Sequence, residues 1–138
     1  MSIRDYDEVL GLLESIEGVR LRSADSQEGI ARYLERNPGC SFVAEAEGEV
    51  VGCIMSGHEG RRGYLQHLAV APSYRRRGLG RELVTRSLLK LVEQGISKAH
   101  IDVLTSNVAG TAFWVSQGWQ RREDIHRFSF VNSTDRNA

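Results

Sequence analysis

Near the start of the chain, two segments carry apolar residues every three or four positions, which is the period of an amphipathic helix. The stripe in the first segment, residues 7–16, consists of Val9, Leu10, Leu12, Leu13 and Ile16. The stripe in the second, residues 24–39, consists of Ile30, Tyr33 and Leu34. Either Asp25 or Ser26 could cap this second helix, and the run Asn37-Pro38-Gly39 would end it.

The period then changes to that of strands. Residues 41–57, "SFVAEAEGEVVGCIMSG", contain two β-rich runs around a turn at Glu47-Gly48, which predicts a hairpin. A third strand is predicted at 64–71, "YLQHLAVA". Three consecutive strands with short connections favour an antiparallel meander.

After Pro72 the helical period returns. The stripe there consists of Leu79, Leu83, Val84, Leu88, Leu91 and Val92. Gly95 is placed to end this helix, and Glu82 with Arg86 forms a favourable pair at i,i+4 spacing.

The remaining pattern predicts a strand at 98–104, a short helix at 107–117 and a closing strand region at 119–131. The polar tail 132–138 is expected to be frayed. The order of elements predicts an α/β fold of the α+β type, with a single mixed, largely antiparallel central sheet flanked by helices. Residues 1–131 would form one domain.

Charge and composition argue against several classes of function. Lys+Arg and Asp+Glu each number 18, so no bulk field recruits nucleic acid or an anionic membrane. No apolar run approaches the roughly 20 residues of a membrane span, and no signal core precedes residue 10, so we expect a cytoplasmic protein. Cys40 and Cys53 have no metal-site spacing, and Cys53 is expected to be a buried, inert thiol. We therefore expect no metal.

The segment "SYRRRGLGR", residues 73–81, is the candidate for anion binding. It follows a strand and opens a long helix, where free amides and the helix dipole favour phosphate. Glycine at positions 78 and 80 removes β-carbons that would hold an anion away. The absence of GK[ST] and of a third glycine at position 83 excludes the P-loop and the dinucleotide fingerprint. Taken alone, this spacing is equally compatible with a hydrated surface loop.

Two motifs together resemble the GNAT superfamily of N-acetyltransferases, in particular its small bacterial members. "LAVAPSYRRRGLGRELV" is similar to the acetyl-CoA segment of that family, with its Arg-x-x-Gly-x-Gly pattern on Arg75, Gly78 and Gly80. "NVAGTAFWVSQGW" is similar to a downstream family motif, on Asn107, Gly110, Phe113, Trp114, Gly118 and Trp119. The resemblance covers roughly residues 40–120.

The resemblance implies acetyl-CoA as co-substrate and two central strands that splay apart around the thioester. Amides in the turn would hold the CoA pyrophosphate, the third strand would pair with the pantetheine arm, Asn107 would hydrogen-bond that arm, and an aromatic side chain of the last helix would pack along it. The implied cofactor-binding residues are Leu68, Ala69, Val70, Arg75, Arg76, Arg77, Gly78, Leu79, Gly80, Arg81, Asn107, Phe113 and Trp114.

Acetyl transfer needs a neutral amine and a stabilised tetrahedral intermediate. Deprotonating a lysine-like amine at pH 7 costs about 4.6 kcal/mol, so a general base helps. Asp102 is the first choice for that base, with His67 or Tyr64 as alternatives, and by family analogy the Val70 amide would be the oxyanion donor. Because strand neighbours face opposite sides, His67 and Leu68 are not both expected to line the cleft.

Trp114 is the main departure from the family pattern, because many relatives have a tyrosine there that protonates the leaving thiolate. An indole N–H can donate a hydrogen bond but is not a practical acid. A non-catalytic acyl-CoA-binding regulator is therefore the alternative to an N-acetyltransferase acting by direct transfer in a ternary complex. Nucleic-acid binding through Arg75–Arg77 with Arg61 and Arg62 is a second alternative, disfavoured by neutrality.

The N-terminal segment leaves little room for the family's first strand, which we expect to be short or missing. The sequence does not identify the amine acceptor. A homodimer is the default expectation for the oligomeric state.

Overall fold

The structure, a computed structural model, describes residues 1–138 and contains one mixed four-stranded sheet. The strands are β1 (Phe42–Ala46), β2 (Glu49–His58), β3 (Gly63–Val70) and β4 (Ala99–Ile101), in the order β1-β2-β3-β4. The first three are antiparallel neighbours, and β4 is parallel to β3. The predicted fold class and meander are confirmed.

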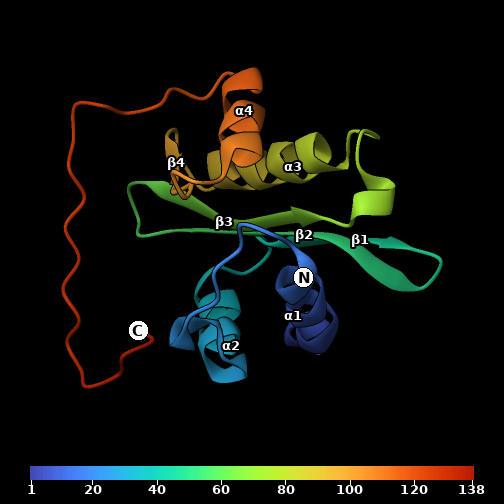
Figure 1. Ribbon diagram of the computed structural model, residues 1–138, viewed down its shortest axis with the longest axis horizontal. Helices are drawn as coiled ribbons and strands as arrows, with labels where there is room; N and C mark the ends of the chain where they lie inside the picture. The colour runs from blue at the N-terminus through green and yellow to red at the C-terminus, as the bar shows by residue number, and fades with distance from the viewer.

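Helices cover both faces of this sheet (Figure 1). The helices are α1 (Tyr6–Ser15), α2 (Gln27–Arg36), α3 (Leu79–Glu93) and α4 (Val108–Ser116), with short 3₁₀ turns η1 (Ile3–Asp5), η2 (Ser23–Asp25) and η3 (Pro72–Tyr74). α1 and α2 lie on one face, and α3 and α4 on the other. No strand precedes α1, which confirms the missing first strand. None of the helices is both long and apolar enough to cross a bilayer.

Local chemistry explains the element ends. Of the two possible caps of α2 the structure uses Ser26, whose hydroxyl accepts a hydrogen bond from the Gly29 amide at 3.2 Å. The predicted hairpin turn is confirmed, with positive φ at both Glu47 (53°) and Gly48 (79°), as a two-residue turn of this kind requires. Gly95, at φ 81°, follows the end of α3 as predicted.

Two apolar clusters sandwich the sheet. Ile54, Leu65, Leu83, Val84, Leu91, Ile96 and Trp114 form the cluster on the α3 and α4 side. Val9, Leu12, Leu13, Cys53 and Ala69 form the cluster on the α1 side. β2 is buried continuously from residue 51 to 57 because it contributes to both.

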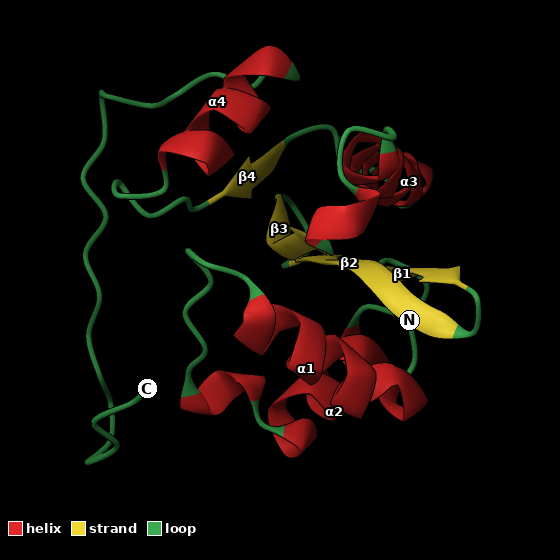
Figure 2. Cartoon of the chain, turned by 45° about the vertical axis from the view of Figure 1, so that its right-hand side comes forward, coloured by secondary structure: helices red, strands yellow, loops and turns green.

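β3 and β4 pair over three residues only, and this short pairing opens the sheet. The register joins Gly63 to Ala99, Tyr64 to His100 and Leu65 to Ile101, and pairing then stops. The sequence predicts a strand over 98–104, which is too long at its C-terminal end. Residues 102–104 diverge from β3, so they have no neighbouring strand with which to form a ladder (Figure 2).

A β-bulge in β3 changes which side chains share a face. Gln66 pairs with Met55 and Ala69 with Cys53, so His67 and Leu68 together oppose the single residue Ile54. His67 has a φ of 51°, which is unusual for a residue other than glycine. Side chains therefore do not alternate between the two faces of the sheet at this point. The expectation that His67 and Leu68 cannot both line the cleft is wrong, because both residues line the cavity.

The closing strand predicted at 119–131 is not formed. This segment has no regular secondary structure and runs along one side of the molecule from α4 toward η2 (Figure 1). Two of its ion pairs lie within the segment, among them that of Arg122 with Asp124 at 2.7 Å, whereas Arg127 pairs with Asp102 after β4. Strand propensity is expressed only where a neighbouring strand supplies ladder hydrogen bonds. The tail beyond it, expected to be frayed, returns to η2, where the Asn137 carbonyl accepts from the Ser23 amide at 3.0 Å.

Two leucines of α3 provide a test of this packing. Leu91 is 1% exposed in the core, whereas Leu89, on the opposite face of the same helix, is 58% exposed. We expect Leu91→Ala to lower the free energy of unfolding by about 2–5 kcal/mol. Leu89→Ala should change it by less than about 0.5 kcal/mol. Urea denaturation of both variants measures this, and equal losses would contradict the assigned core.

Candidate active site

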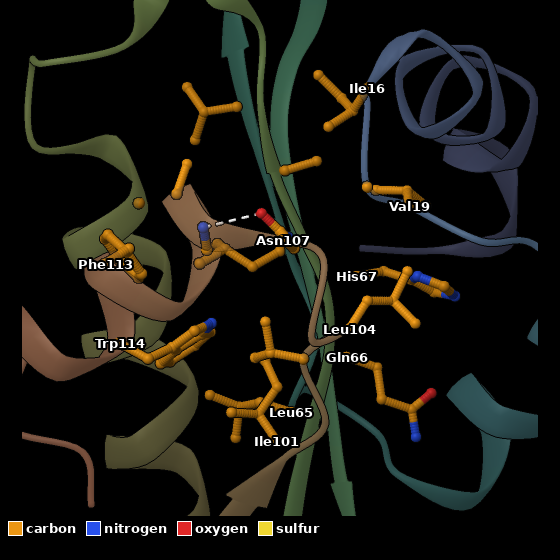
Figure 3. Close-up of a pocket in the computed structure, with 18 of the residues that line it drawn as sticks. Ile16, Val19, Leu65, Gln66, His67, Ile101, Leu104, Asn107, Phe113 and Trp114 are labelled. Carbon is orange, nitrogen blue, oxygen red and sulfur yellow. Dashed lines mark hydrogen bonds between the residues drawn. The ribbon is translucent and has the colours of Figure 1, made fainter. Parts of the chain in front are cut away.

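A cavity of about 890 Å³ occupies the gap between β3 and β4. Its walls come from β3, β4 with the residues that follow it, the turn before α3, α4 and the loop after α1. Figure 3 shows Phe113 and Trp114 on one side of the strands and Ile16, Val19 and His67 on the other. The cavity therefore reaches both faces of the sheet.

One end of the cavity is formed by the N-terminus of α3. Gly78 is the N-cap, with φ 81°, and its carbonyl accepts from the Glu82 amide at 3.0 Å. The amides of Leu79, Gly80 and Arg81 precede that first helical hydrogen bond and have no acceptor within the helix. A β-carbon added at Gly78 would meet no atom within 4 Å, so the backbone is open to an approaching anion. This geometry suits a phosphate group.

The arginines of the turn have different environments. Arg75, Arg76 and Arg81 line the cavity. The Arg75 Nε donates to the Val70 carbonyl at 3.0 Å. Arg77, also predicted to bind cofactor, is not among the lining residues, and its guanidinium lies 5.0 Å from the ring centroid of Tyr74. The turn therefore brings three of its four arginines to the cavity.

The free edge of β3 forms the floor of the cavity. The Ala71 amide donates to Val51 on β2 at 2.8 Å. Since amides alternate in direction along an antiparallel strand, the Val70 amide points away from β2, toward the gap. The same alternation turns the backbone of Leu68 to the gap and that of Ala69 toward β2. Val70 and Leu68 are thus placed to bond an extended ligand.

Asn107 and Phe113 join α4 to the rest of the site. The Asn107 side-chain oxygen accepts from the Gly110 amide at 2.9 Å and caps α4, and its Nδ2 forms no hydrogen bond within the chain. The Phe113 ring lies 3.4 Å from the position a β-carbon on Gly80 would take. The two motifs singled out in the sequence therefore meet at Gly80, which needs to be small for this contact.

Trp114 is both a core residue and a wall of the cavity. Only 7% of it is exposed, and its ring stacks edge-on with Trp119 at 4.7 Å and with Phe113 at 5.2 Å between centroids. Its indole nitrogen points toward the cavity in Figure 3. Trp114 therefore presents a hydrogen-bond donor, but no ionisable hydroxyl, to the cavity.

Asp102 lies directly after β4 and is one of the residues that line the cavity. Its side chain is 68% exposed, and Oδ2 accepts from Arg127 Nη1 at 3.0 Å. An exposed ion pair of this kind is worth about 1 kcal/mol or less. Asp102 therefore meets water and an incoming substrate without a large desolvation cost.

His67 lies deeper and has a fixed partner. Its Nε2 is 2.7 Å from Oδ1 of Asp25 in η2, and the two side chains are only 15% and 13% exposed. Burial by itself raises the pKa of the Asp25 carboxyl. The hydrogen bond from His67, the Arg22 amide and the charge of His67 together outweigh burial and lower that pKa. Asp25 is therefore ionised at neutral pH.

The other candidate groups differ in accessibility. Tyr64 lines the cavity, with its ring 5.8 Å from that of His100. Cys53 is fully buried, as predicted, and burial raises the pKa of its thiol to about 12, which disfavours the reactive thiolate. No group of three or more His, Cys, Asp or Glu side chains converges as a metal site.

Sequence reasoning missed Asp25, Arg127 and the loop 16–20. Asp25 was noticed only as a possible helix cap, and it is separated from His67 by 42 positions. Arg127 lies in a segment predicted to be a strand. The one local signal in the loop is Gly18, which has a positive φ of 88°. A β-carbon added to Gly18 would lie 3.1 Å from Asn107 Nδ2.

Comparison with known proteins identifies the class of the protein. The model of the Acetyltransferase (GNAT) family matches residues 7–119, so the chain belongs to this family. An acetyltransferase of Sodalis glossinidius is 34% identical over 121 residues, covering 88% of this chain and 84% of the relative. One of Pectobacterium atrosepticum is 36% identical over 105 residues, covering 76% and 74%. The chain is an acetyl-CoA-dependent N-acetyltransferase.

Solved structures show the same fold. A GCN5-related N-acetyltransferase from Ralstonia eutropha superimposes with a TM-score of 0.70 at 23% identity, covering 94% of this chain and 95% of the other. An aminoglycoside acetyltransferase from an uncultured soil metagenomic sample, in complex with sisomicin, gives 0.76 at 20% identity, covering 96% and 93%.

The phosphate end of the cavity can be tested with two glycines of equal backbone strain. Gly78 and Gly95 flank α3, both have φ 81°, and neither has an atom within 4 Å of an added β-carbon. Valine at either position should cost similar stability, about 1–2 kcal/mol. Gly78→Val should also weaken CoA binding at least tenfold in calorimetric titration, because it distorts the amides facing the phosphate.

Gly95→Val is the control and should leave the CoA dissociation constant unchanged within about twofold. If Gly78→Val folds and binds CoA as tightly as this control, the turn is not the phosphate site.

Proposed function

We propose that this enzyme transfers the acetyl group of acetyl-CoA to a primary amine by direct attack within a ternary complex. The observation that carries this proposal is a single cavity that reaches both faces of the sheet, with the α3 turn at one end and ionisable side chains at the other. The CoA phosphates would lie at the amides of residues 78–81, and the pantetheine arm along the free edge of β3. The amine would enter past the loop 16–20.

The reaction forms a C–N bond and breaks the C–S bond of the thioester and an N–H bond of the amine. The amine nitrogen attacks the thioester carbonyl carbon, the C–S bond breaks, and the amine loses a proton. The Val70 amide points into the gap, where it can donate to the oxygen of the tetrahedral intermediate. Preorganised donors of this kind stabilise charge that develops only in the transition state.

The leaving thiolate does not require a strong acid. A thiol has a pKa of about 8.5, so the thiolate is a tolerable leaving group near neutral pH. The indole N–H of Trp114 can donate a hydrogen bond to the sulfur, and solvent then supplies the proton. This arrangement accounts for a working enzyme without the tyrosine found in many relatives.

Asp102 and His67, both predicted as candidate bases, are suited to different steps. The exposed carboxylate of Asp102 at the mouth is placed to attract a cationic amine. His67, which is mostly buried and fixed by Asp25, is placed to accept the proton. Protonated amines predominate in solution at neutral pH, so attraction at the mouth precedes deprotonation inside.

Steady-state kinetics separate these roles. Asp102→Asn should raise the KM of a cationic amine roughly fivefold, the equivalent of about 1 kcal/mol for an exposed charge, with kcat within twofold. Arg127→Gln, which frees the same carboxylate, is the matched control and should lower that KM. A large fall in kcat with an altered pH–rate profile for Asp102→Asn would instead make Asp102 the base.

The function itself is tested by release of free thiol from acetyl-CoA across a panel of primary amines. The panel should include sisomicin, which a structural neighbour binds, simple diamines and peptides with free N-termini. We expect turnover with at least one amine and a product heavier by one acetyl group. Micromolar CoA binding without turnover of any amine would favour the non-catalytic regulator.

A further inference from the structure

His67 is held in an unusual backbone conformation. It is one of three residues other than glycine with positive φ, and it is the only one of these within a strand. The left-handed region costs a residue with a β-carbon roughly 1–2 kcal/mol. Such strain persists where surrounding contacts impose it, and it concentrates at functional sites. The bulge at 67 and 68 turns the imidazole toward η2 while keeping the residue in the cavity wall.

Asp25 is fixed from three directions. Oδ1 contacts His67 Nε2 at 2.7 Å, and Oδ2 accepts from the Arg22 amide at 2.8 Å. The Asp25 carbonyl accepts from the Tyr6 hydroxyl at 2.9 Å, which ties η2 to α1. Neither carboxylate oxygen is free to rotate away, so Asp25 holds the imidazole in one orientation.

We propose that His67 is the general base of the acetyl transfer and that Asp25 is its positioning residue, which fixes the ring tautomer. This inference rests on the proposed function and extends it. An ionised carboxylate can only accept, so Nε2 carries a proton, and in the neutral form of the imidazole the lone pair is then on Nδ1. Nδ1 has no hydrogen-bond partner within the chain. In the proposed reaction it receives the proton that the amine loses.

A cationic amine loses two protons in each transfer, and Nδ1 accepts them one after the other. It passes the first to solvent, and the neutral nitrogen then bonds to the acetyl carbon and gives Nδ1 its second proton as the C–S bond breaks. The resulting imidazolium is stabilised by the Asp25 carboxylate, as in a hydrolase triad. It returns the proton to solvent, from which the CoA thiolate is protonated, and the neutral imidazole is restored.

A matched control exists within the same chain. η1 and η2 contain the same local arrangement, in which an aspartate accepts from the backbone amide three residues before it: Asp5 from Ser2 at 2.7 Å, and Asp25 from Arg22 at 2.8 Å. Asp5→Asn therefore removes the same kind of carboxylate without touching His67. A merely structural role for Asp25 predicts similar consequences for both variants.

The test is a double-mutant cycle on the full chain, with acetyl-CoA and the amine of the panel that is turned over fastest. His67→Gln should lower kcat at least a hundredfold, and Asp25→Asn about tenfold, with the KM of acetyl-CoA changed by less than twofold. In the His67→Gln background, Asp25→Asn should lower kcat by less than twofold. Asp5→Asn should leave kcat unchanged.

Nitrogen NMR of the imidazole gives a second readout that needs no acceptor. In the wild-type protein Nε2 should have the shift of a protonated nitrogen and Nδ1 that of an unprotonated one, and Asp25→Asn should mix the two tautomers. Equal effects of Asp25→Asn on kcat in both backgrounds, or an unchanged tautomer, would overturn the inference. Turnover of no amine would instead contradict the proposed function.

Discussion

The short pairing of β3 with β4 is the constraint on which the rest of the site depends. Three residue pairs hold the two strands together, and beyond Leu65 and Ile101 they separate. The cavity lies in the resulting gap. A longer ladder would consume the strand edge that Val70 now presents to the gap, and a shorter one would leave β4 without support.

Packing on the two faces keeps the gap open. On one face, Phe113 lies against Gly80 and Trp114 against Trp119, so α4 is wedged onto the start of α3. On the other face, the contact of Asp25 with His67 joins η2 to the bulge in β3. The helices that flank the sheet thus determine where the strands part, and they position the groups that act on each substrate.

Much of this arrangement could be predicted from the sequence, because it rests on local signals. Helical and strand periods located the hairpin, the third strand and all four helices, and the Arg-x-x-Gly-x-Gly motif located a turn that lines the cavity. The contact between Asp25 and His67 could not be predicted in the same way. Asp25 meets His67 only through the tertiary packing of η2 on β3, and the bulge that aims His67 leaves no mark in the residue pattern.

The segment 119–131 shows where prediction from local sequence patterns fails. Its alternating pattern, with Phe128 and Phe130 separated by Ser129, predicts a strand, yet those phenylalanines are 92% and 89% exposed. Strand propensity describes a fit to a neighbouring strand, and no neighbour is present. The single contact of Arg127 with Asp102 instead brings this segment to the mouth of the cavity, where sequence reasoning did not expect it.

Amide hydrogen exchange tests whether the free edge of β3 binds acetyl-CoA. The Ala71 amide already donates to Val51 and serves as an internal reference. Because acetyl-CoA carries the thioester oxygen to which the Val70 amide would donate, we predict that saturating acetyl-CoA slows exchange at Val70 at least tenfold and leaves Ala71 unchanged. Binding of acetyl-CoA with no added protection at Val70 would contradict this prediction.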